Sequence, residues 1–183
     1  MTKGQLRKKL LRLLRQQKEE EQRRRSEAIA RKVFRLAAFR RAKMVCCYVS
    51  LPYEVHTWRM IEEMLKKGKR VAVPVTQPRT RRLWLSELRN PSRELTRGQL
   101  GVLEPRPGLR RPVRIKEVDL VLVPGLAFDG WGHRLGRGHG YFDRFLARLP
   151  KTTPTVGLSY RFQLLDRLPI TAHDHAVCKV LSA

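Results

Sequence analysis

The sequence is poor in acidic residues, in cysteine and in aromatic residues, and it has no long apolar run. It contains 16 Asp and Glu against 40 Lys and Arg in 183 residues, which gives a net charge of +24. A positive surplus of this size attracts anionic partners without selecting one of them. Aromatic residues make up only 7%, whereas stacking on single-stranded nucleic acid needs aromatic rings among the basic residues. We therefore expect at most nonspecific contact with nucleic acid.

The three cysteines form no disulfide framework. Cys46, Cys47 and Cys178 lack C-x-x-C spacing, which indicates a reducing, cytoplasmic environment. The longest apolar stretch, residues 118–128, includes Asp119 and is too short to cross a bilayer. Charged sequence follows the first basic residues, so we expect no secretory signal and no membrane association.

The length and the apolar fraction favour a folded protein. At 183 residues with 42% hydrophobic residues, the chain is long enough to bury a substantial core. We expect one domain spanning residues 1–183 and acting as a monomer.

Hydrophobic periodicity predicts alternating helices and strands. Leucines at four-residue spacing and a later apolar stripe predict two basic helices within residues 3–39. A further helix is predicted at residues 60–68, with strands at 44–49, 70–75, 82–88 and 118–124. This alternation indicates an α/β fold with a mainly parallel sheet covered on both faces, and sites at the carboxyl ends of its strands. Residues 90–116, rich in Pro, Gly and Arg, predict a long surface loop or a lid.

A glycine-rich loop carries the clearest chemical signal. Residues 123–146 read VPGLAFDGWGHRLGRGHGYFDRFL, the pattern of a strand, a loop and the start of a helix. Gly136, Gly138 and Gly140 allow the backbone to approach a ligand, and Arg134 and Arg137 suit phosphate oxygens. The loop predicts a phosphate cradle, although such glycines also mark ordinary tight turns.

The residues around this loop resemble one family. The run PGLAFD followed by RLGRGHGYFDR resembles the signature of the 5-formyltetrahydrofolate cyclo-ligases. The similarity continues at four other places, in the same order: KGQLR at residues 3–7, YVSLPYEVHT at 48–57, GVLEP at 101–105 and LPITAHD at 168–174.

The resemblance implies a fold and a reaction. The fold is a three-layer α/β/α arrangement. The reaction converts 5-formyltetrahydrofolate and ATP, with Mg²⁺, into 5,10-methenyltetrahydrofolate, ADP and phosphate by way of a phosphorylated formyl oxygen. The substrate is a reduced folate, with or without a polyglutamate tail. Such phosphoryl transfer calls for positioned cations and backbone donors more than for a nucleophile.

The resemblance also implies roles for individual residues. Arg134 and Arg137 are the expected catalytic residues, and Glu54 is expected to bind the pterin. The ATP contacts are expected at Lys3, Arg7, Arg134, Leu135, Gly136, Arg137, Gly138, His139, Gly140, Tyr141 and Phe142. The folate contacts are expected at Val49, Glu54, Arg137, Gly138, His139, Gly140 and Tyr141, and the magnesium ligands at Asp143 and Asp174.

Structural alternatives exist for several of these residues. Tyr141 and Phe142 also suit a core, Asp143 a helix cap, and Lys3 and Arg7 a solvated helix face.

Two positions depart from the family pattern. His56 stands where an acid is usual, and Cys178 stands where an aspartate is usual. If that aspartate helps to hold magnesium, this chain has to do without it or use Asp174 instead. His173 and His175 have no partner at zinc spacing, so a loop that orients Asp174 is the preferred interpretation. Two other functions stay open: a polyanion-binding protein, and a family member with a changed substrate or no activity.

Overall fold

The computed structural model describes residues Met1–Ala183, apart from the side chain of Gln99. The helices are α1 (Lys3–Arg15), α2 (Glu19–Arg35), α3 (Ala37–Arg41), α4 (Trp58–Lys66), α5 (Pro91–Glu94) and α6 (Tyr141–Leu146). Single 3-10 turns lie at Gln99–Gly101, Pro107–Leu109, Ile115–Glu117 and Arg161–Gln163. No helix in this described part of the chain is long and apolar enough to span a membrane.

The first helix forms because its sequence supplies a cap and an apolar stripe. The Thr2 hydroxyl accepts from the Gln5 backbone N–H, and the Gln5 side chain accepts from the Thr2 N–H, which completes a capping box. Leu6, Leu10 and Leu14 are buried at four-residue spacing. Helices are confirmed in residues 3–39, separated at residues 16–18, and α4 confirms the helix expected near residues 60–68.

A seven-stranded sheet forms the centre of the molecule, in the order β12-β10-β7-β1-β2-β3-β6. Its strands are β1 (Met44–Cys47), β2 (Arg70–Gln77), β3 (Arg82–Leu88), β6 (Pro112–Val113), β7 (Leu120–Val123), β10 (Thr155–Ser159) and β12 (Lys179–Ser182). The strands from β12 to β2 run parallel, and β3 and β6 are antiparallel additions. The mainly parallel expectation is confirmed. The direct turn at residues 78–81 makes β3 antiparallel to β2, since a parallel partner needs a longer crossover.

Two smaller sheets complete the strands. One has the order β11-β8-β9, and the other pairs β4 with β5. Their bounds are β4 (Leu95–Arg97), β5 (Leu103–Pro105), β8 (Ala127–Asp129), β9 (Arg134–Leu135) and β11 (Leu164–Leu165).

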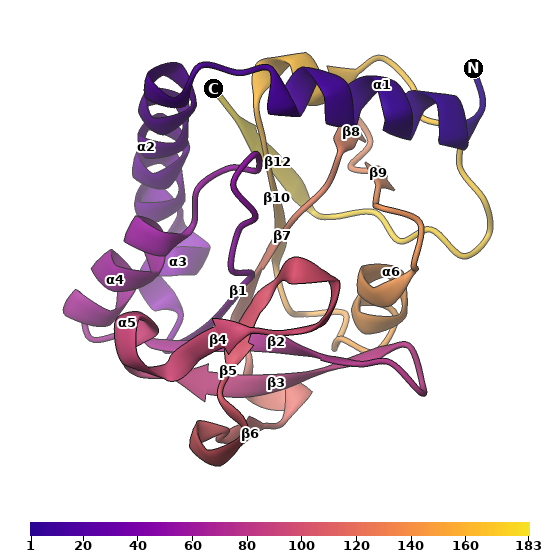
Figure 1. Ribbon diagram of the computed structural model, residues 1–183. Helices are drawn as coiled ribbons and strands as arrows, with labels where there is room; N and C mark the ends of the chain where they lie inside the picture. The colour runs from indigo at the N-terminus through magenta and orange to yellow at the C-terminus, as the bar shows by residue number, and fades with distance from the viewer.

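Two apolar clusters lie on opposite faces of the central sheet. One joins α1–α4 to the sheet, and the other joins α6 and β8 to it. Cys47 belongs to the first cluster and Cys46 to the second, as strand alternation predicts. Burial raises the pKa of the Cys46 thiol to about 12, so both cysteines serve packing. In Figure 1 the helices α2–α4 lie on one side of the sheet, α6 on the other, and α1 across one end.

Residues 90–116 are more ordered than a plain surface loop. Glu94 is buried and forms an ion pair with Arg111 at 2.8 Å. Glu104 accepts a hydrogen bond from the Thr76 backbone N–H at 2.9 Å. These buried carboxylates attach α5, β4 and β5 to the central sheet. The segment therefore forms part of the fold, and its contribution to the site comes from Leu100 and Val102.

Candidate functional site

A cavity opens where the order of the parallel strands reverses. From β1 the chain builds β2 on one side, and later β7, β10 and β12 on the other. The cavity lies beyond the carboxyl ends of β1, β7 and β2, which is where ligands bind in open α/β sheets. Its empty volume is about 880 Å³, including space open to solvent. The lining residues are Tyr48, Val49, Leu51, Glu54, Pro74, Thr76, Leu83, Leu100, Val102, Pro124, Gly125, Leu126, Arg134, Gly136, Arg137, His139, Gly140, Tyr141, Phe142 and Asp143.

The glycine-rich loop forms one wall of this cavity. It connects β9 to α6, and Gly138 and Gly140 have φ values of +103° and +66°, which other residues adopt only under strain. A Cβ atom on Gly136 would lie 2.7 Å from the Arg134 Nη1 atom. Glycine is therefore required by the shape of the loop. α6 has only six residues, so the loop itself supplies most of the backbone N–H groups and the arginine side chains on this wall.

Arg134 is buried beneath this loop. Its side chain is 4% exposed, and its Nη2 atom donates to Asp143 Oδ1 at 2.7 Å. Burial lowers the pKa of Arg134, and the nearby Asp143 and Asp174 carboxylates oppose that shift. The buried Nε atom has no hydrogen-bond partner among the residues that the structure describes. A cation held this way is oriented before any ligand arrives.

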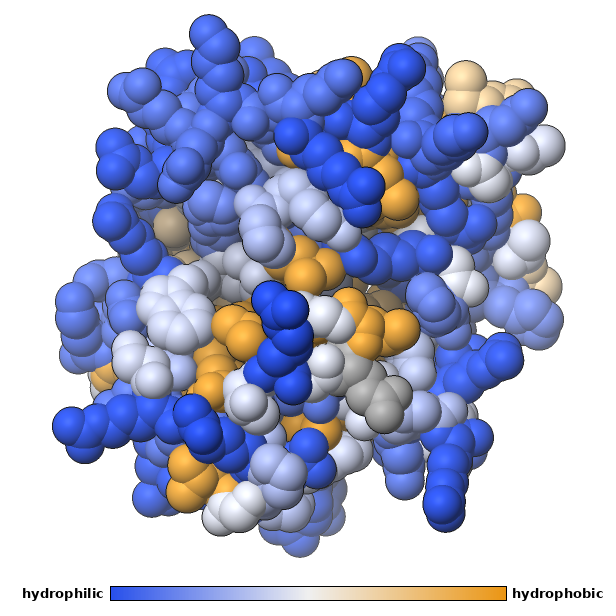
Figure 2. Space-filling model, viewed as in Figure 1, coloured by the Kyte–Doolittle hydropathy of each residue, from blue (hydrophilic) through white to orange (hydrophobic). Residues whose placement is uncertain are grey.

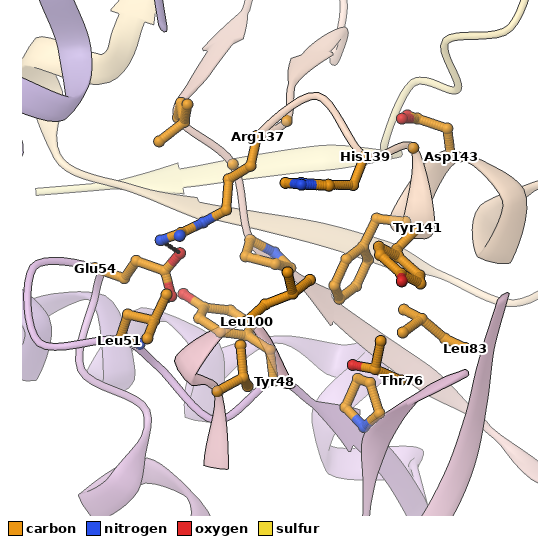
Figure 3. Close-up of a pocket in the computed structure, with 18 of the residues that line it drawn as sticks. Tyr48, Leu51, Glu54, Thr76, Leu83, Leu100, Arg137, His139, Tyr141 and Asp143 are labelled. Atoms are coloured by element: carbon orange, nitrogen blue, oxygen red, sulfur yellow. Dashed lines mark hydrogen bonds and ion pairs between the residues drawn. The ribbon is translucent and has the colours of Figure 1, made fainter. Parts of the chain in front are cut away.

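Arg137 connects the glycine-rich loop to the opposite wall. Its Nη2 atom donates to Glu54 Oε1 at 3.0 Å, and Glu54 Oε2 accepts from the Leu51 N–H at 2.9 Å. Figure 3 shows Arg137 reaching toward Glu54, with Tyr141 and Leu83 at the other end of the cavity. An ion pair thus lies toward each end of the cavity, Arg137 with Glu54 at one and Arg134 with Asp143 near Tyr141 at the other, and most of the remaining lining is apolar. This arrangement suits a ligand with an aromatic ring system and polar edges.

The N-terminal helix contributes two further cations. Arg7 Nε donates to the Gly136 carbonyl at 2.9 Å. Lys3 forms an ion pair with Asp174 at 2.5 Å. Burial alone would raise the pKa of Asp174, but the hydrogen bonds from Lys3 and Thr171 outweigh it and leave this pKa lowered. α1 therefore lies against both the glycine-rich loop and the C-terminal loop.

The structure brings most of the expected site residues together. Val49, Glu54, Arg134, Arg137 and the residues from His139 to Asp143 line the cavity or lie beside it. Leu135 does not expose its side chain there, since this residue is only 2% exposed and belongs to the core.

Sequence reasoning missed the apolar lining. Tyr48, Pro74 and Thr76 lie at or near the carboxyl ends of predicted strands, and Leu83 is the second residue of the antiparallel neighbour β3. The position of a residue at a strand end was the available signal for the first three. Leu100 and Val102 gave no signal, because their segment has no regular periodicity.

Comparison with known proteins identifies the family. The model of the 5-formyltetrahydrofolate cyclo-ligase family matches residues 1–183. The chain belongs to this family. It is 32% identical over 183 residues to the 5-formyltetrahydrofolate cyclo-ligase of Mycolicibacterium smegmatis, covering 99% of this chain and 93% of that one. It is 34% identical over 135 residues to the cyclo-ligase of Escherichia coli K12, covering 73% and 74% of the two chains.

A solved structure agrees in fold. The 5,10-methenyltetrahydrofolate synthetase of Aquifex aeolicus superposes with a TM-score of 0.86 at 35% identity, over 100% of this chain and 90% of that one. The α/β fold expected from the sequence is therefore confirmed.

The departure from the cyclo-ligase pattern at Cys178 lies away from the cavity. Cys178 precedes β12, and its N–H donates to the Thr155 carbonyl at the amino end of β10. The cavity lies beyond the carboxyl ends of the parallel strands, whereas Cys178 lies beside the amino end of β10. A thiol at this position therefore removes no ligand from the cavity. Asp174 does not line the cavity either, and it forms an ion pair with Lys3 of α1.

The carboxylates near the glycine-rich loop suit magnesium. Mg²⁺ in phosphoryl-transfer sites takes one or two carboxylates together with phosphate oxygens. Asp143 uses Oδ1 for Arg134, and its Oδ2 atom makes no hydrogen bond among the described residues. This half-buried oxygen is of the hard type that magnesium prefers. His173 and His175 belong to no metal-binding cluster in the described chain.

Proposed function

We propose that this cyclo-ligase family member converts 5-formyltetrahydrofolate and ATP into 5,10-methenyltetrahydrofolate, ADP and phosphate. The observation that carries the proposal is the joint placement of Arg134 and Arg137 around the glycine-rich loop, with Glu54 facing them across one cavity. Cations and backbone donors lie on one wall, and a carboxylate suited to pterin N–H groups lies on the other.

In this proposal α1 and the glycine-rich loop bind ATP. The phosphates lie on the loop from Gly136 to Gly140, with Lys3 and Arg7 contributing from the helix. Leu135 contributes backbone only, because its side chain is buried. Tyr141 and Phe142 provide apolar contact beside the phosphates. Asp143 and Asp174 would hold Mg²⁺, which neutralises phosphate charge when bound.

The folate lies in the apolar part of the cavity, in contact with Val49 and with Tyr141. Glu54 accepts hydrogen bonds from the pterin ring, which fixes the formyl group relative to the ATP phosphate. Bidentate acceptance by a carboxylate gives both orientation and affinity. The basic surface of α1 and α2 adjoins this region, and Figure 2 shows hydrophilic side chains across it. Such a surface suits a polyglutamate tail.

The chemical step is transfer of the γ-phosphoryl group to the formyl oxygen. The bond from phosphorus to the ADP oxygen breaks, and a bond to the formyl oxygen forms. N10 then attacks the activated carbon and loses its proton, the bond from that carbon to the phosphorylated oxygen breaks, and phosphate leaves with the former formyl oxygen as the ring closes. Arg134 and Arg137 stabilise the charge that develops on the transferring group. We place this reaction in the cytoplasm, because the three cysteines are free, as is usual in a reducing compartment. We also propose that the protein acts as a monomer.

Absorbance in the methenyltetrahydrofolate band tests the proposal. Purified protein is mixed with 5-formyltetrahydrofolate, Mg²⁺ and ATP, and the control omits ATP. Growth of the band only with ATP supports the proposal. No growth, in protein that is folded and binds ATP, would contradict it and favour a family member with a changed substrate. Failure to bind ATP as well would favour the polyanion-binding alternative.

A further inference from the structure

Two arginines from distant parts of the chain lie against one tyrosine ring at the edge of the cavity. The guanidinium carbon of Arg137 lies 5.1 Å from the centre of the Tyr53 ring, and that of Arg15 lies 5.5 Å from it. Both distances are within the range of cation–π attraction. Arg15 comes from the last turn of α1, Tyr53 from the loop between β1 and α4, and Arg137 from the glycine-rich loop. One ring thus connects three segments around the cavity.

The Tyr53 hydroxyl adds a hydrogen bond to the ring contact. Arg137 Nη2 donates to the Tyr53 oxygen at 2.5 Å and to Glu54 Oε1 at 3.0 Å. The Tyr53 ring is partly buried and packs against the main apolar cluster, which restricts its rotation. Arg137 therefore has two supports, one charged and one neutral.

The two supports differ in what a ligand does to them. Glu54 is the carboxylate proposed to accept hydrogen bonds from the pterin, and a carboxylate occupied by substrate interacts less with Arg137. Tyr53 does not line the cavity, so a ligand leaves its ring and hydroxyl in place. Without a second support, Arg137 would lose orientation when the folate enters. The long arginine side chain would then regain rotamer freedom that has to be removed again for phosphoryl transfer.

We propose that Tyr53 is a positioning residue that keeps Arg137 directed at the anionic ligand, with Arg15 as a second cation on the same ring. This inference rests on the proposed function, because it assigns Arg137 to the phosphates. Two guanidinium groups gathered on one ring also increase the positive potential at the edge of the cavity, which favours an approaching polyphosphate.

A double-mutant cycle tests this with inorganic tripolyphosphate as the probe, measured by titration calorimetry. Tyr53→Phe keeps the ring and removes the hydroxyl, and Tyr53→Leu removes both. We expect affinity to fall about threefold for Tyr53→Phe and about tenfold for Tyr53→Leu. In the background of Arg137→Met, we expect Tyr53→Leu to cause a much smaller further loss, because only Arg15 remains on the ring.

Phe34→Leu is the matched control. The Phe34 ring also lies beside a cation, with Lys67 Nζ 5.6 Å from its centre, but Lys67 does not line the cavity, whereas Arg137 does. This variant should keep the affinity of the wild type. Thermal unfolding of every variant checks that the fold is retained.

The inference is overturned by any of three results: no measurable tripolyphosphate binding by the wild type, unchanged affinity in Tyr53→Leu, or an equal loss with and without Arg137. None of these measurements depends on turnover. Failure of the proposed function would instead appear as no ATP-dependent methenyltetrahydrofolate in the wild type. In a protein that turns over, Tyr53→Leu should lower kcat about tenfold, and Arg137→Met should remove that difference.

Discussion

Arg134 and Asp143 form an ion pair whose arginine is almost completely enclosed, while its aspartate reaches solvent. Their side chains are 4% and 21% exposed, and Nη2 lies 2.7 Å from Oδ1. The pair joins β9 to α6 and so spans the glycine-rich loop between them. It fixes the ends of the loop and leaves one aspartate oxygen available at the cavity. The same contact thus serves the fold and the proposed chemistry.

Replacement of Arg134 should impair both the stability of the fold and the turnover of the enzyme. Arg134→Ala should reduce turnover roughly 10²–10³-fold, as for loss of one preorganised charge-stabilising group. It should also lower the free energy of unfolding by about 3 kcal/mol, because Asp143 loses its partner in a half-buried position. Activity assays and urea unfolding measure the two effects.

Arg70→Ala is the matched control for that variant. Arg70 forms an ion pair of the same length, 2.7 Å, with Glu87, but its side chain is 52% exposed. Arg70 is the first residue of β2 and so lies at the amino end of the strand, whereas the cavity lies beyond the carboxyl end. The expected change in stability is below about 1 kcal/mol, with turnover unchanged. Equal turnover in the Arg134→Ala variant and the wild type would remove Arg134 from the site.

Asp143→Asn should act mainly on magnesium. The amide oxygen can still accept the hydrogen bond from Arg134, so the loop should keep its shape while one negative charge is lost. We expect the Mg²⁺ concentration for half-maximal activity to increase roughly tenfold or more. A magnesium titration at saturating ATP measures this. An unchanged titration curve would show that Asp143 only anchors Arg134.

Glu54→Ala should act mainly on the folate. The variant loses the proposed hydrogen-bond acceptor for the pterin and releases Arg137 from one of its two supports. We expect KM for 5-formyltetrahydrofolate to increase roughly tenfold or more, with a smaller change in KM for ATP. Steady-state kinetics with each substrate varied in turn separates the two. Near-normal folate affinity would argue against the assigned role.

The glycine-rich loop shows how much of the site the sequence could predict. Glycines at alternate positions, with Arg137 and His139 between them, indicate a close backbone approach without any knowledge of the fold. The contact between Lys3 and Asp174 has no such local signal, because 171 positions separate the residues. The role of Tyr53 could not be predicted from the sequence either, since a tyrosine after a proline predicts only a loop. Tertiary packing alone brings Arg15 and Arg137 to its ring.

The same limit applies to the fold. β1, β2 and β7 are continuous apolar runs, and their periodicity is enough to predict them. β8, β9 and β11 contain two or three residues each, too few for any period to be recognised. Residues 90–116 acquire their order from two buried carboxylates. The Glu94–Arg111 pair and the Glu104 hydrogen bond to Thr76 form only in the folded chain.

The three cysteines should differ sharply in reactivity. Cys178 is exposed, whereas Cys46 and Cys47 are buried, and burial raises the pKa of both, to about 12 for Cys46. An aromatic disulfide reagent should therefore modify only Cys178 in the native protein, and all three after unfolding. Turnover should survive this modification, because Cys178 lies at the amino end of β10. Loss of activity that Cys178→Ser prevents would contradict that placement.

Asp129 should make stability depend on pH. It is buried and accepts hydrogen bonds from the backbone and ring of His133 and from the Leu168 N–H. Burial alone would raise the pKa of this carboxyl, but these bonds outweigh it and leave the pKa lowered. A depressed pKa contributes stability above the unfolded value of about 4, and this contribution is lost as pH falls through the folded value. Asp129→Asn should therefore be less stable than the wild type by about 2 kcal/mol at about pH 7, and the gap should narrow toward about pH 3. Urea unfolding of both proteins at the two pH values measures this, and a gap that stays constant would mean that Asp129 stabilises the turn without a lowered pKa.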